Sequence, residues 1–166
     1  MAKAREIPGL TEELAYGEVA ARVLEVRIEE LIDHSENVLD TADIERVHAI
    51  RVATRRLRAA IEVFRPCFPK GAGKRALAEV KALADALGER RDRDVAILAL
   101  EGFAAAMPAP DRPGIHSLID GYAAEQEEAN ADLAPFVDEA RLAALRDQVV
   151  KLAASARAVA EGSDEA

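Results

Sequence analysis

The sequence VHAIRVATRRLR, at residues 47–58, has helical periodicity on two faces at once. An α-helix turns by about 100° per residue, so residues three, four and seven positions apart share a face. One face is apolar and suited to a core, and continues beyond the stretch; its members are Ile50, Leu57, Ile61 and Phe64. The other face is basic; its members are His48, Arg51, Arg55 and Arg58, with Arg56 to one flank. The stretch therefore predicts an amphipathic helix with a cationic outer face.

The same periodicity extends over most of the 166 residues, and no period-two strand pattern interrupts it. We expect helices at about 11–39, 43–65, 73–87, 92–107, 111–133 and 137–160. Thr11, Asp43 and Asp111 are the expected N-caps, Gly88 is the expected C-cap of the third helix, and Pro113 is tolerated in a first turn. The chain is thus predicted to be all-α, an antiparallel bundle of about six helices. We expect a short N-terminal segment (1–9), one helical domain (10–160) and a flexible tail (161–166).

Charge is distributed unevenly along the chain. The formal net charge is -9, yet residues 46–93 hold 13 Lys and Arg against 5 Asp and Glu. An acidic protein is poorly suited to indiscriminate binding of nucleic acid, whereas a basic island predicts a localised anion site. Aromatic residues make up only 4% of the chain, and none lies on the basic face of residues 47–58. Binding of single-stranded nucleic acid, which uses aromatic stacking, is therefore not expected.

Other classes of protein are disfavoured by composition. The single cysteine, Cys67, cannot form an internal disulfide, which suits a reducing compartment. No apolar run approaches the roughly 20 residues that span a bilayer. We expect a soluble, cytoplasmic protein that does not bind membranes.

The basic face has a physical cost that a ligand would remove. Like charges one helical turn apart destabilise a helix, and no acid lies within residues 47–58 to relieve them. A multivalent anion would do so, and the planar guanidinium of arginine can donate two hydrogen bonds to one phosphate. Two simpler interpretations remain open. The face could be merely solvated, or its arginines could pair with acids on neighbouring helices.

Two stretches resemble one known family. VHAIRVATRRLRAAIEVFRP (47–66) resembles the signature helix of the CHAD family, the conserved histidine α-helical domain, and ALGERRDRDVAIL (86–98) resembles its second landmark. The resemblance is strongest over residues 10–107. It implies a helical bundle that binds inorganic polyphosphate without catalysis, and a link with CYTH-type triphosphate-processing proteins.

Carried over by position, the resemblance indicates a set of polyphosphate-binding residues: His48, Arg51, Arg55, Arg56, Arg58 and Arg91. Lys74 and Lys81 lie seven residues apart on one predicted face and are added as phosphate contacts, although Lys81 could instead pair with Asp85. Asp92 and Asp94 would repel phosphate. We expect them to cap a helix start and to hold arginines of the 47–58 helix in place.

The chain departs from the family pattern in its second half. Family members usually have two related halves, each with a histidine and basic residues, but His116 in GIHSLIDGY is followed by no such residues. We therefore treat the chain as a short, single-landmark member. Two copies could pair as a homodimer to rebuild the two-halved arrangement.

Two other functions are kept as alternatives. His48 could serve a phosphate-processing enzyme or its accessory subunit as an acid or phosphoryl acceptor. The acidic helices could instead make the chain an adaptor for a partner protein. There is no phosphate-binding glycine loop with a following Lys-Ser/Thr, and His34, His48 and His116 lack metal-ligand spacing. We expect no catalytic residue, no metal and no cofactor.

Overall fold

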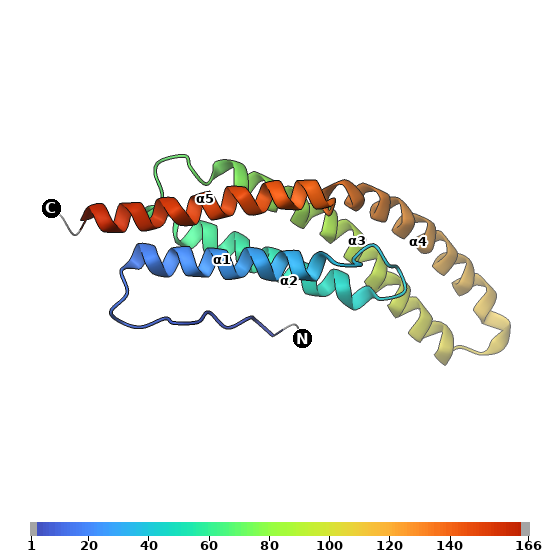
Figure 1. Cartoon of the computed structure of the whole chain (residues 1–166). Helices are drawn as coiled ribbons and strands as arrows, with labels where there is room; N and C mark the ends of the chain where they lie inside the picture. The colour runs from blue at the N-terminus through green and yellow to red at the C-terminus, as the bar shows by residue number, and fades with distance from the viewer. Residues whose placement is uncertain (1–2, 164–166) are drawn as a thin grey trace.

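The computed structural model describes residues 3–163 and is drawn in Figure 1. It is all-α, with five α-helices: α1 (Tyr16–Ser35), α2 (Ile44–Val63), α3 (Lys74–Ala106), α4 (Arg112–Leu133) and α5 (Glu139–Ser163). Three short 3₁₀ turns lie at Arg65–Cys67, Ala109–Asp111 and Ala134–Phe136. The described residues contain no strand, so the predicted fold class is confirmed.

The core lies where α1 packs on α2 and α5, and α2 packs on α3. Its fully buried aliphatic side chains include Leu24, Ile50, Leu57 and Leu87. Gly17 permits the close approach of α1 and α5, because a Cβ at this position would collide with the carbonyl oxygen of Ala156. The apolar face predicted for residues 47–58 thus packs into the bundle, and the basic face is left outside.

The prediction of about six helices was wrong at Gly88, where one helix was expected to end. The structure has a single helix, α3, of 33 residues through this position. Positive φ angles, the usual mark of a glycine C-cap, occur among the described glycines at Gly9 and Gly71, and not at Gly88. A glycine inside a helix costs about 1 kcal/mol relative to alanine. The burial of helix residues just before and just after Gly88, Leu87 and Arg90, outweighs that local cost.

Several predicted helix ends also differ from the structure. The first helix begins at Tyr16, after Ala15, so Thr11 is not its N-cap. Asp43 and Asp111 do occupy the residue before a helix, but neither side chain makes a capping hydrogen bond. Pro113 lies in the first turn of α4, as predicted. The helix α5 continues to Ser163, into the tail predicted for 161–166, and residues 164–166 lie outside the described residues.

One part of the molecule stands away from the bundle. Figure 1 shows the second half of α3 and the first half of α4 extending past α1 and α2 as a hairpin. Of the α-helices in residues 3–163, α4 contacts α3 alone. We call residues 95–125 the arm. The arm and the bundle share α3, so this helix sets the position of both.

Candidate anion-binding site

A cavity of about 360 Å³ opens along the basic face of α2. It is lined by four of the predicted residues together with Val52 and Ala84, namely His48, Arg51, Arg55 and Arg58. Since Ala84 belongs to α3, the cavity lies between these two helices, and we call it the groove. The structure thus brings together the four basic side chains that were placed on one face by helical spacing.

The cations of the groove differ in whether the protein already neutralises them. Arg51 and Arg55 are exposed, and within residues 3–163 neither they nor His48 make a hydrogen bond or ion pair through their side chains. Arg58 donates to Glu62 on the next turn, with 3.1 Å between Nε and Oε1. Arg51 and Arg55 have no acid three or four residues away on α2, which explains the difference. The groove therefore contains guanidinium groups with unused donors.

The predicted lysines lie on α3. Lys74 and Lys81 are exposed and, taken at 100° per residue, lie within about 80° of Ala84 around the helix axis. No ion pair joins Lys81 to Asp85 or Lys74 to any acid among the described residues. Both lysines therefore extend the positive charge from the groove along α3.

Arg91 makes a contact that ties two helices together. Its Nη1 donates to the backbone carbonyl of Ile44, at 3.1 Å, and its Nη2 lies 3.9 Å from the carboxylate of Glu45. Ile44 is the first residue of α2, and Arg91 lies on the same side of α3 as Ala84. The guanidinium thus anchors the start of α2 beside the groove, and part of its donor capacity is used within the fold.

Arg56 does not line the groove. Its Nη1 donates to Oε1 of Glu30 on α1, at 2.9 Å, and the Glu30 side chain is only 2% exposed. The Glu30 carboxylate also accepts from Arg27, at 2.7 Å, and from the backbone N–H of Arg5, at 3.1 Å. Arg56 therefore joins α2 to α1 and to the N-terminal segment, on the flank where the helical wheel placed it.

The partners of Glu30 change its acidity. Burial alone raises the pKa of the Glu30 carboxyl, but the hydrogen bonds from Arg27 and Arg5 and the charges of Arg27 and Arg56 outweigh it. The pKa of Glu30 therefore lies below its ordinary value of 4.5. Through this cluster Arg56, which belongs to the same helix as the groove arginines, stabilises the fold.

The acids of the second landmark do not start a helix, so the expectation that they cap one was wrong. Asp92 and Asp94 lie inside α3, where the backbone N–H groups are already bonded within the helix. Asp92 is exposed, and its carboxylate makes no hydrogen bond or ion pair within residues 3–163. Asp94 is buried and accepts from Arg90 of its own helix, at 2.9 Å, rather than from an arginine of α2.

Arg90 is the residue that sequence reasoning missed. Its side chain is fully buried, and its Nη1 donates to Oδ1 of Asn130 on α4, at 2.6 Å. Gln126, also on α4, donates to Asp94 at 2.6 Å, and Asn130 donates to the carbonyl of Leu39 at 2.8 Å. The Arg90–Asp94 pair thus fastens the base of the arm to the bundle. A signal for this was present, because Leu83, Leu87, Arg90 and Asp94 follow one another at core spacing.

Residues 3–163 contain no cluster of three or more His, Cys, Asp or Glu side chains that could hold a metal ion. None of the helices in this range combines the length and the apolar character that crossing a membrane requires. Burial raises the pKa of the free thiol of Cys67, which lies in the core.

The sequence matches the model of a known protein family. The model of the CHAD domain family matches residues 22–166, which include all of α2, α3, α4 and α5. No protein of curated function matches the chain by sequence. The matched region contains every residue that lines the groove and both residues of the buried pair on α3.

Proposed function

This chain belongs to the CHAD domain family, and from that premise we propose that it binds inorganic polyphosphate in the groove between α2 and α3 without breaking it down. The observation that supports the proposal most directly is the state of Arg51 and Arg55. Both are exposed, line the groove and lack an acidic partner among the described residues. Arginines held in this way keep their donors available for a ligand with many phosphates.

The shape of the positive charge favours a linear polyanion. The four groove residues of α2 span ten positions, or about 15 Å along the helix axis. Lys81 and Lys74 continue the charge along α3, on the same side as Ala84. A chain of phosphates can follow such a track, whereas a single phosphate would leave most of these cations unused.

Polyphosphate fits the groove better than nucleic acid does. The lining of the groove includes no Phe, Tyr or Trp, the side chains on which the bases of single-stranded nucleic acid usually stack. Polyphosphate has charge of the same kind and no bases. We also assign the protein to the cytoplasm, where its single free thiol suits a reducing environment, and propose CYTH-type proteins as functional partners.

Reversal of the two unpaired cations tests the proposal. We expect Arg51→Glu combined with Arg55→Glu to weaken polyphosphate binding at least about a hundredfold, because each position loses a charge-assisted bond and gains repulsion. Titration calorimetry with polyphosphate of defined length measures the loss, and circular dichroism checks that helicity is retained.

A second variant controls for net charge. Arg75→Glu with Lys151→Glu makes the same charge change at two exposed residues away from the groove; Arg75 lies on the side of α3 opposite Ala84. This control should bind polyphosphate within a few-fold of the wild type. If both double variants lose affinity equally, the groove is not the site.

Two more measurements complete the test. The logarithm of the binding constant should fall linearly with the logarithm of salt concentration, as for other phosphate polymers. Polyphosphate incubated with the protein and a divalent metal should keep its length on a gel. Shortened chains would instead favour the enzyme alternative based on His48.

A further inference from the structure

The arm exposes more apolar surface than its place in a bundle explains. Within the described residues, five large apolar side chains of the arm are exposed: Val95, Leu98, Phe103, Leu118 and Tyr122. Because α4 contacts no α-helix other than α3 in residues 3–163, no other helix of this range covers the outer side of α4. A two-helix hairpin that leaves such residues in water is a surface suited to another protein element.

The total surface of the chain indicates how much could be covered. A compact monomer of 17.8 kDa exposes about 8,000 Å² on average. This chain exposes 9744 Å², which is roughly 1,700 Å² more than that average. Obligate homodimers bury about 2,000–5,000 Å² in total, or about 1,000–2,500 Å² on each partner. The extended N-terminal segment and the arm both contribute to this surplus, which is of the same order as one half of such an interface.

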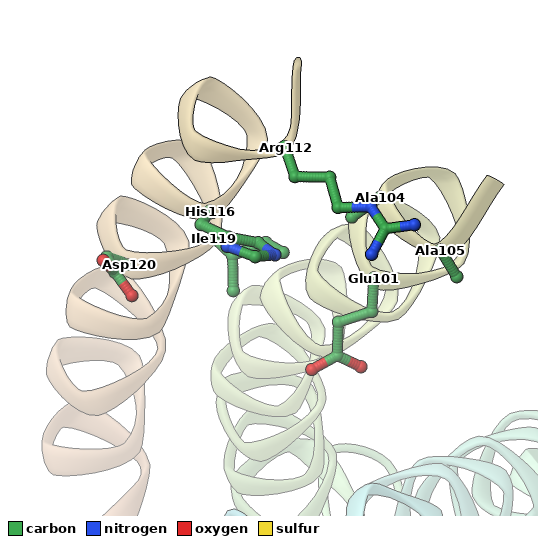
Figure 2. Close-up of a pocket in the computed structure, with 7 residues that line it drawn as sticks. All are labelled: Glu101, Ala104, Ala105, Arg112, His116, Ile119 and Asp120. Atoms are coloured by element: carbon green, nitrogen blue, oxygen red, sulfur yellow. The ribbon is translucent and has the colours of Figure 1, made fainter. Parts of the chain in front are cut away.

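The tip of the arm has charges that complement one another. A cavity of about 610 Å³ opens there between α3 and α4. Figure 2 shows His116 and Ile119 pointing from α4 toward α3, with the Arg112 guanidinium reaching across above Glu101. The Nε of Arg112 donates a hydrogen bond to the backbone carbonyl of Met107. Neither Arg112 nor Glu101 has an ion-pair partner among the described residues. A second copy of the same tip offers each of these charges its opposite.

We propose that the arm is a self-association surface, on which a second copy of this chain buries Val95 and Leu98 and exchanges Arg112–Glu101 ion pairs. A twofold arrangement satisfies both conditions, because each copy supplies one cation and one carboxylate. The two arms together would form a four-helix layer from two hairpins that are each open on their own. The proposal is independent of any ligand in the groove.

The mass of the full chain in solution tests the proposal. Sedimentation velocity without polyphosphate should give a dimer whose dissociation on dilution is reversible. Val95→Glu should weaken self-association at least about tenfold, as expected for a charge placed in an interface core. The matched control is Val150→Glu, because Val95 is 48% and Val150 42% exposed, on α3 and α5 respectively. The control should dimerise like the wild type.

A mixing experiment tests the identity of the partner. Arg112→Glu and Glu101→Arg should each weaken dimerisation, because both ion pairs become repulsive. An equal mixture of the two variants should recover dimers, because both pairs are then attractive. Circular dichroism shows whether each variant remains folded. A wild type that stays monomeric at the highest attainable concentration overturns the proposal, as does a mixture that shows no recovery.

Discussion

The groove and the base of the arm use arginine in opposite ways. In the groove, Arg51 and Arg55 are exposed and have no acid within one helical turn. At the base of the arm, Arg90 is fully buried and bonded to Asp94, one turn further along α3. Both sites are built on regular helices with the same spacing rules. For these three arginines, an acid four residues away and a buried side chain distinguish Arg90, which holds the fold, from the two that are left for a ligand.

This contrast predicts a large difference in stability. Asp94→Ala should lower the free energy of unfolding by about 3–5 kcal/mol, because it leaves the Arg90 charge buried without its partner. Arg55→Ala should change it by less than about 0.5 kcal/mol. Urea denaturation followed by circular dichroism measures both.

A double substitution provides the control for that experiment. Arg90→Met with Asp94→Leu removes both charges together and should be less destabilising than Asp94→Ala alone. Equal losses for the single and double variants would mean that the ion pair is not the important contact at this position.

The ion pairs of Glu30 predict that the stability supplied by structural arginines depends on pH. Its depressed pKa means that the folded state favours the carboxylate, so its contribution to stability is complete above about pH 4.5 and is lost as the pH falls through the lower, folded-state pKa. Glu30→Gln should cost about 2–3 kcal/mol at neutral pH. The difference in free energy of unfolding between the wild type and Glu30→Gln should become smaller at acidic pH. Denaturation curves at several pH values measure it, and a constant gap would contradict the assignment.

Arg55 and Arg56 allow the comparison to be made with adjacent residues. Arg56→Ala should lower stability by about 1.5–3 kcal/mol, because it removes a bond to the buried Glu30 carboxylate, and should leave polyphosphate affinity within a few-fold. Arg55→Ala should instead weaken polyphosphate binding and leave the stability almost unchanged. Paired denaturation and binding measurements on the two variants decide this. A greater loss of binding for Arg56→Ala would move the site to the α1 side of α2.

The smallest expected effect concerns His48. The added charge of a protonated histidine would attract phosphate, so wild-type binding should be a few-fold tighter in mildly acidic than in mildly basic buffer. His48→Gln should remove this dependence, whereas His34→Gln, outside the groove, should keep it. Calorimetric titrations at fixed ionic strength measure the profile.

Local spacing predicted much of the molecule, and long-range contacts account for what it missed. The two faces of residues 47–58 were predicted correctly because helical geometry alone places His48, Arg51, Arg55 and Arg58 together. The continuation of α3 through Gly88 was not predicted, since the burial of Leu87 before it and Arg90 after it outweighs the low helix propensity of glycine. Arg56 was assigned by resemblance to the site, but its partner, Glu30, lies on another helix and 26 residues earlier. No spacing rule identifies such a partner.

The unbroken course of α3 has a mechanical consequence. Ala84 in the groove and Glu101 at the tip of the arm belong to the same helix, 17 residues apart, which is about 26 Å of continuous hydrogen-bonded backbone. A helix of this kind resists bending far more than a loop does. A ligand bound in the groove and a partner bound at the tip of the arm would therefore be held at a fixed distance and orientation relative to one another.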